Sequence, residues 1–134
     1  MTDNYEIEFD IEAKCEKEIK KDGIHIGKYI DKIMKYAVMF YETGVESHIS
    51  KIIPSIQAQL YFDTTLYTVK LGLKERALIT IDEDEVFDRL IITLWAFTKN
   101  HNYEKIFRGL GESMYQKYLN QGGISNEWKR VNWW

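Results

Sequence analysis

The chain of 134 residues holds one cysteine, Cys15, and one proline, Pro54. One thiol cannot close an internal disulfide, so the disulfide frameworks of small secreted proteins are excluded. The N-terminal residues show neither the basic stretch nor the apolar run of a signal peptide, and no segment is apolar enough to predict a membrane span. We therefore expect a cytoplasmic protein without membrane contacts, in which residues 1–134 form one domain.

The motifs of the common enzyme classes are missing as well. His25, His48 and His101 stand far apart in the chain and lack the spacing of metal ligands, so no metal site is predicted. Gly109 and Gly111 supply only half of the glycine-rich dinucleotide-binding motif, and no strand is expected before them. We predict no catalytic residue and no cofactor, and we favour a protein that is not an enzyme, although distant residues can still meet in a site.

Charge is distributed in alternating blocks. The net charge of −3 divides into −4 over residues 1–23, +2 over residues 24–76, −4 over residues 77–90 and +3 over residues 91–134. Such blocks usually mark solvated surface, and they can also support self-association or the docking of a partner. Lysine (14, against 4 arginines) and isoleucine (17, against 5 alanines) are over-represented, a bias typical of bacterial or phage coding.

The N-terminal segment has two interpretations. Apolar or small residues alternate with charged ones over residues 5–15, and a period of two indicates a β-strand. Alternatively, only residues 5–10 are extended and a charged helix covers residues 11–21, because alanine, glutamate and lysine favour helices. Asp22-Gly23 then marks a turn.

Helical periodicity is clear in the segment that follows. Apolar residues three or four apart over residues 26–43 predict an amphipathic helix, and Gly44 stands where a left-handed C-cap is expected. The spacing of isoleucines over residues 45–53 predicts a short helix, which Pro54 ends or kinks.

Residues 55–71 are compatible with two structures. Their apolar spacing suits a helix, whereas several threonines and Val69 favour a hairpin that turns at Asp63-Thr64. We favour the helix because no glycine-containing turn signal occurs there. Residues 77–81 are then expected to be briefly extended.

Three cues predict that a helix begins at Asp82 and runs to Lys99. Asp82 and Glu85 have the spacing of a capping box, and Ile81 and Val86 have the spacing of a hydrophobic staple. The acidic residues of this segment also suit the positive end of a helix dipole. The apolar face that follows is the widest in the chain, so this helix is expected to be the central one.

A last helix is predicted over residues 103–119, with Gly109 and Gly111 at a kink or a close helix crossing. Beyond it, the tail over residues 125–134 combines tryptophans with basic residues. Such residues anchor protein interfaces and also stack on bases and contact phosphates, while the alternative is a tail that packs over the core. The candidate contact residues are Trp128, Lys129, Arg130, Trp133 and Trp134.

Together these patterns predict a mainly α-helical fold, a compact bundle of four to five helices with an optional N-terminal strand. The alternative is an α+β fold with a small antiparallel sheet. The expected function is that of a small interaction protein that binds another protein or itself, with a dimer as one form, in a phage or mobile-element setting. The alternative is a nucleic-acid-binding protein that uses the basic, Trp-rich C-terminal third.

Overall fold

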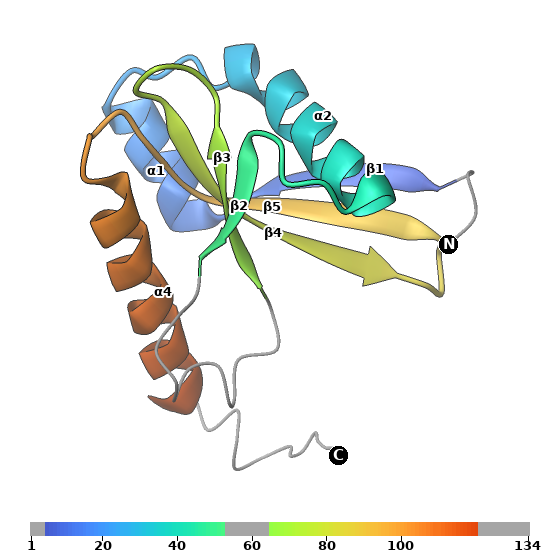
Figure 1. Cartoon of the computed structure of the whole chain (residues 1–134). Helices are drawn as coiled ribbons and strands as arrows, with labels where there is room; N and C mark the ends of the chain where they lie inside the picture. Colours follow the sequence, from blue (N-terminus) through green and yellow to red (C-terminus); the bar gives the residue numbers. More distant parts are fainter. Residues whose placement is uncertain (1–4, 53–64, 121–134) are drawn as a thin grey trace.

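The computed structural model describes residues 5–52 and 65–120, with side chains up to residue 111, and these residues form a β-sheet with helices on both faces (Figure 1). In chain order the elements are β1 (Glu6–Ile11), α1 (Ala13–Lys21), α2 (Gly27–Thr43), β2 (Ile49–Ile52), β3 (Leu66–Lys70), β4 (Arg76–Asp84), β5 (Arg89–Thr98) and α4 (Tyr103–Asn120).

The described strands form one mixed sheet in the order β1-β5-β4-β3-β2. β1 pairs with β5 in parallel, and the other neighbouring strands are antiparallel. Because β1 and β2 occupy opposite edges, α1 and α2 carry the chain from one edge of the sheet to the other (Figure 1). The prediction of a helix bundle is therefore wrong. The alternative of an α+β fold is confirmed, with a mixed sheet in place of an antiparallel one.

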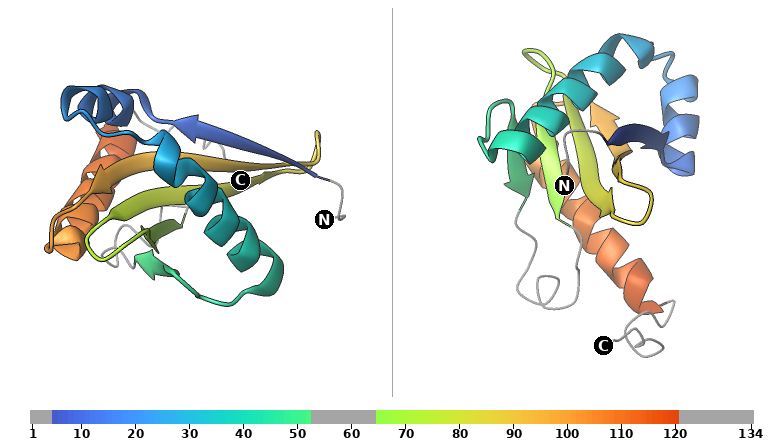
Figure 2. Two further views of the ribbon diagram at one scale, coloured as in Figure 1. Left: turned by 90° about the horizontal axis from the view of Figure 1, so that it is seen from above. Right: turned by 90° about the vertical axis from the view of Figure 1, so that its right-hand side faces the viewer.

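Both faces of the sheet are apolar, which explains why helices cover each of them. α1 and α2 pack on one face, where the buried cluster includes Ile33, Ile79 and Leu94. α4 packs on the other face, where Phe107 contacts a cluster that includes Leu78. The right-hand view of Figure 2 shows α2 in front of the strands and α4 behind them. β4 and β5 contribute side chains to both layers.

The N-terminal segment follows the second of its two interpretations. β1 ends just before Glu12, whose side chain caps α1 by accepting a hydrogen bond from the backbone N–H of Cys15 at 3.1 Å. The alternation stops there because α1 needs a helical spacing to bury one face. The helix predicted over residues 26–43 is confirmed as α2, and Gly44 caps it with a φ of 73° in the left-handed region.

Cys15 is 4% exposed, and its burial, reinforced by the charges of Glu12 and Glu18, raises the pKa of its thiol to about 12. Since the thiolate is the nucleophile, we expect native Cys15 to react with a disulfide reagent at pH 8 roughly a thousandfold more slowly than Cys15 in urea-unfolded protein. A thiol pKa raised above its ordinary value of 9.0 also predicts that stability falls as the pH rises from about 9 toward about 12. Equal reaction rates in folded and unfolded protein would contradict this burial.

The short helix predicted over residues 45–53 is wrong, because residues 49–52 form β2 and residues 45–48 are not helical. Ile49 and Ile52 lie three apart, which suits one face of a helix. In a strand the same odd separation places them on opposite faces, and each joins a different buried cluster. Pro54 lies outside the described residues.

The helix favoured over residues 55–71 is wrong from Leu66 onward, where β3 pairs with both β2 and β4. The β-forming residues Thr68 and Val69, which favoured the strand alternative, are both buried in β3. The predicted hairpin turn at Asp63-Thr64 lies outside the described residues.

The helix predicted from Asp82 to Lys99 is also wrong, because these residues form the end of β4, a turn and β5. The cue for a helix start is a hydrogen bond from a backbone N–H to a carboxylate three residues earlier. The hairpin makes a bond of the same kind between other residues, from the Phe87 N–H to Asp84 Oδ1 at 3.3 Å. Asp88 adopts a φ of 55° and helps to complete the turn.

A β-bulge in β5 shapes the face that α4 covers. Leu78 pairs with Ala96, whereas the next residue of β4, Ile79, pairs with Leu94. β5 therefore has one extra residue here, Trp95, which has no partner in the β4 register. The Trp95 side chain joins the cluster under α4, and its indole N–H donates a hydrogen bond to the buried Thr80 hydroxyl at 2.9 Å. The bulge thus brings an aromatic side chain and its polar partner to this layer.

The predicted last helix is confirmed as α4. Gly111 lies against β3, since a β-carbon at this position would be 3.0 Å from Leu66 Cδ1, whereas Gly109 has open space around it. The predicted close crossing is therefore a contact between a helix and a strand.

Candidate functional site

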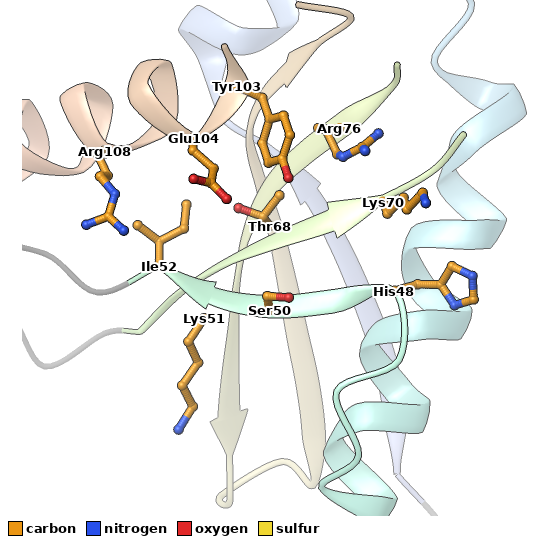
Figure 3. Close-up of a pocket in the computed structure, with 10 residues that line it drawn as sticks. All are labelled: His48, Ser50, Lys51, Ile52, Thr68, Lys70, Arg76, Tyr103, Glu104 and Arg108. Atoms are coloured by element: carbon orange, nitrogen blue, oxygen red, sulfur yellow. The ribbon is translucent and has the colours of Figure 1, made fainter. Parts of the chain in front are cut away.

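A pocket of about 350 Å³ lies between the start of α4 and the β2–β3 edge of the sheet (Figure 3). Its lining comes from β2 and the residue before it, from β3, from the first residue of β4 and from the first two turns of α4. The lining residues are His48, Ser50, Lys51, Ile52, Thr68, Lys70, Arg76, Tyr103, Glu104 and Arg108.

Positive charge dominates this lining. The lining contains four basic side chains, those of Lys51, Lys70, Arg76 and Arg108, and one carboxylate, that of Glu104. Figure 3 shows the Glu104 carboxylate pointing from α4 toward Thr68 and Arg108 reaching from α4 toward β2, while Lys51 projects from the other side of β2 and therefore contributes at the rim. Among the described residues, neither lysine forms an ion pair, and neither does Arg76. The pocket therefore holds excess positive charge.

The most buried polar side chain of the lining is that of Thr68. Thr68 is 9% exposed, and its hydroxyl has no hydrogen bond to any residue in the described ranges. Ser50 on β2 is the register partner of Thr68, and the Tyr103 hydroxyl points toward the Thr68 side chain (Figure 3). The other buried threonine, Thr80, is satisfied by Trp95. An unmet buried hydroxyl costs about 1–3 kcal/mol, so Thr68 has binding capacity that the described protein does not use.

Arg76 is held in place by the turn that precedes it. Its Nη1 donates to the carbonyl oxygens of Gly72 at 2.9 Å, Leu73 at 3.4 Å and Glu75 at 3.0 Å. Its Cζ lies 4.7 Å from the centre of the Tyr103 ring. Nε and Nη2 have no acceptor among the described residues, so this fixed guanidinium can still donate to a phosphate or a carboxylate.

The positive field continues from the pocket to the turn between β3 and β4. Hydrogen bonds from the backbone N–H groups of Glu75 and Lys74 lower the pKa of the Glu75 carboxyl, and the charges of Lys99 and Lys28 lower it further. This end of the sheet therefore attracts anions toward the pocket.

Negative charge gathers at the opposite end, around the β4–β5 turn. Because β1 lies beside β5, Glu6 and Glu8 at the start of β1 come next to the acidic block of residues 77–90. Arg89 forms ion pairs with Glu8 at 2.8 Å and with Asp84 at 2.7 Å, and its hydrogen bond lowers the pKa of the Asp84 carboxyl. β4 is 9 residues long, so the two ends are about 30 Å apart.

The predicted contact residues Trp128, Lys129, Arg130, Trp133 and Trp134 lie outside the described residues, and their role stays a prediction. Sequence analysis missed the pocket because its residues come from four separate elements, and two of these, β2 and β3, were wrongly predicted to be helices. One signal was present, since the two positively charged blocks, residues 24–76 and 91–134, supply all four basic side chains.

Two further features are missing from the described part of the chain. No three His, Cys, Asp or Glu side chains are grouped there as they would be around a metal ion. None of the helices in this part has the length and hydrophobicity needed to cross a membrane. No family model matches the chain, and neither the curated proteins nor the solved structures with which it was compared contain a match.

Proposed function

We propose that this protein binds an anionic ligand in the pocket between α4 and the β2–β3 edge, and that the group held there is a phosphate. One observation carries the proposal: the buried Thr68 hydroxyl has no partner among the described residues and belongs to a lining with four basic side chains and one carboxylate. A bound anion would accept a hydrogen bond from this hydroxyl and would offset the excess positive charge.

A phosphate suits the lining better than a carboxylate does. A phosphate group offers three strong acceptor oxygens and a charge of about −1.5 to −2 near pH 7. The lining contains the hydroxyl groups of Ser50, Thr68 and Tyr103 and the cationic side chains of Lys70 and Arg76. A carboxylate, with two oxygens and one charge, would leave more of these donors unused.

The proposal agrees with part of the sequence analysis. Tyr103 and Arg108 belong to the C-terminal third, which the nucleic-acid alternative singled out, and both line the pocket. Binding to another protein or to a second copy stays a prediction. The described apolar residues best placed for such binding are Val86 and Phe87 in the β4–β5 turn, which are 84% and 69% exposed.

Replacing Thr68 with valine is expected to weaken the binding of ribose 5-phosphate about tenfold, because a hydrogen bond to a charged group is lost. Stability is expected to stay the same or to rise slightly, since the substitution removes a buried hydroxyl that has no described partner. Isothermal titration calorimetry measures the affinity, and urea unfolding measures the free energy of unfolding.

Thr80→Val is the matched control, because Thr80 is buried on the same face but accepts a hydrogen bond from Trp95. This variant is expected to lose about 1–3 kcal/mol of stability and to bind ribose 5-phosphate like the wild type. If Thr68→Val instead destabilises the protein and leaves the affinity unchanged, the Thr68 hydroxyl serves the fold and the proposal is wrong.

A further inference from the structure

We propose that the outer edge of β1 binds an extended segment of a protein partner, in which basic side chains alternate with apolar ones. The segment adds a strand beside β1, at the edge of the described sheet opposite to β2. Because the pocket lies at the β2–β3 edge, binding at β1 does not depend on the proposed function. The protein–protein binding expected from the sequence thereby receives a place on the molecule and a partner of stated chemistry.

β1 has backbone groups that are available to a further strand. The N–H groups of Glu6 and Glu12 donate hydrogen bonds of 3.1 and 3.0 Å to carbonyl oxygens of β5 and of the residue before it. Successive residues of a strand point these groups in opposite directions, so the N–H and C=O groups of Ile7, Phe9 and Ile11 face away from β5. Within the described part of the chain, these outward groups have no hydrogen-bond partner.

The outer side of β1 is open. In the left-hand view of Figure 2, no other described element runs along this side of the dark blue strand, and α1 lies beyond its C-terminal end. β1 pairs with β5 over all of its six residues without a register shift, and it contains neither proline nor lysine. β1 therefore lacks the bulges, prolines and lysines with which natural edge strands avoid pairing.

Contacts at both ends hold β1 in its extended form. At its start, the Tyr5 hydroxyl donates to Glu42 Oε2 of α2 at 2.8 Å, and the Tyr5 ring meets that of Tyr41 edge to face, with the centroids 5.8 Å apart. At its end, the Glu12 side chain caps α1. The edge is thus ordered before a partner arrives, which lowers the entropy cost of adding a strand.

Acidic side chains decide which segment fits this edge. Glu6, Glu8 and Asp10 lie on the sheet face away from α1 and α2. Glu8 pairs with Arg89 at 2.8 Å, whereas Glu6 and Asp10 are exposed and form no ion pair with a described residue. A second copy of β1, paired antiparallel, would bring like charges opposite one another, which is destabilising. Lysines or arginines at the same positions would meet opposite charges, so charge complementarity selects a basic partner.

The other face of β1 supplies an apolar contact. Ile7 is 43% exposed on this face, beside the partly buried side chains of Phe9 and Ile11. Side chains of an added strand alternate between the two faces, so basic residues on the acidic face place their neighbours on the apolar face, next to Ile7. Val86 and Phe87 add exposed apolar side chains in the turn beside the start of β1. The partner segment therefore alternates basic and apolar residues.

The first test uses the capped heptapeptide KVKVKVK as the probe, titrated into the isotope-labelled full chain and followed by nuclear magnetic resonance. In the free protein, the amide protons of Ile7, Phe9 and Ile11 are expected to exchange with solvent rapidly, and those of Glu8 and Asp10 slowly. At saturating peptide, exchange of the three outward amides is expected to slow at least about tenfold, because each second residue of the added strand accepts or donates a hydrogen bond. The control peptide KKKVVVK has the same composition without the alternation and is expected to bind about tenfold more weakly.

The second test removes one outward donor with the substitution Ile7→Pro. The Ile7 N–H does not face β5, so a proline at this edge position is expected to leave the β1–β5 pairing in place and to weaken binding of KVKVKVK at least about tenfold. Ile7→Ala is the matched control, because it truncates the same side chain and keeps the N–H, and it is expected to weaken binding only about threefold. Circular dichroism shows whether each variant is folded.

The third test reverses two charges and keeps the backbone, so it remains decisive if Ile7→Pro does not fold. Glu6→Lys combined with Asp10→Lys is expected to weaken binding of KVKVKVK about tenfold. Asp31→Lys combined with Glu46→Lys is the control, because it makes the same change of net charge at two exposed acids outside β1. The control is expected to change the affinity about twofold or less.

Four results would overturn the proposal. Outward amides that are already protected in the free protein would show that this chain or a second copy covers the edge, and sedimentation would tell which. Equal affinities for the two peptides, or equal losses in the two charge variants, would show that binding follows net charge alone. Equal losses in Ile7→Pro and Ile7→Ala would show that no strand pairs with β1. Failure of KVKVKVK to bind, or binding that leaves the three amides unprotected, would exclude the edge as the site.

Discussion

Replacing Phe107 with alanine is expected to lower the free energy of unfolding by about 3–5 kcal/mol. Phe107 is the largest fully buried side chain among the described residues, and it joins α4 to Ile52, Leu66 and Leu78, which lie on three different strands. Proteins of this size are stable by about 5–15 kcal/mol, so the substitution removes a large share of the stability. Urea unfolding followed by circular dichroism measures the loss.

Phe107→Ala also tests whether α4 forms one wall of the pocket. Tyr103 lies one turn earlier and Arg108 is the next residue, so weaker anchoring of α4 is expected to reduce the affinity for ribose 5-phosphate as well. Ile106→Ala is the control, because Ile106 is 37% exposed and its truncation is expected to cost about 1 kcal/mol or less. Equal losses of stability in the two variants would show that Phe107 does not anchor α4.

The helices that bury one face could be predicted from the sequence. In α2, buried Ile33 and Ala37 lie four apart, and Gly44 supplies the left-handed cap that local chemistry alone predicts. These signals are readable because they depend on residues within a few positions of one another.

The strands could not be predicted in the same way, because helices cover the sheet on both faces. In β5, Ile92 and Leu94 pack under α1 and α2, whereas Trp95 and Ala96 pack under α4. A strand buried on both faces has no polar alternation, and its apolar run imitates a wide helix face. One contrary signal was the β-branched run Ile91-Ile92-Thr93, which favours a strand.

Tertiary partners decide between the helix and the hairpin in this segment. β5 pairs on one side with β4 and on the other with β1, which is about 80 residues away along the chain, as the Glu6↔Arg89 register pair shows. A carboxylate that accepts a hydrogen bond from the backbone N–H three residues later occurs both at the start of a helix and in a hairpin turn, so this local signal does not distinguish the two. Only the pairing with β1 and the burial of both faces select the hairpin, and neither is visible in a window of sequence.

The candidate site was hidden for a related reason. Thr68 becomes informative only because it is buried while its hydroxyl has no described partner. Burial of this kind depends on α4 and on the register of β2 with β3. The net charge of the sequence blocks predicts that anions are attracted, and the fold decides where they would bind.

Reversing the charge of Lys70 with the substitution Lys70→Glu is expected to weaken the binding of ribose 5-phosphate by about 2–4 kcal/mol, or roughly 30- to 1,000-fold. The variant loses a charge-assisted hydrogen bond and places a carboxylate beside a dianion. Lys70 is exposed and forms no ion pair with a described residue, so the free energy of unfolding is expected to change by about 0.5 kcal/mol or less. Calorimetry at low and at moderate salt measures both the loss and its screening.

Lys17→Glu separates the local effect of Lys70 from the change in net charge. Lys17 is exposed on α1, outside the pocket, and the substitution changes the net charge of the protein by the same amount. A glutamate there has Lys14, Lys20 and Lys21 three or four residues away, so it is expected to preserve the helix. Wild-type affinity in Lys17→Glu together with a large loss in Lys70→Glu places the anion at the pocket. Equal losses in the two variants would mean that the ligand responds only to the overall charge, and the pocket would not be its site.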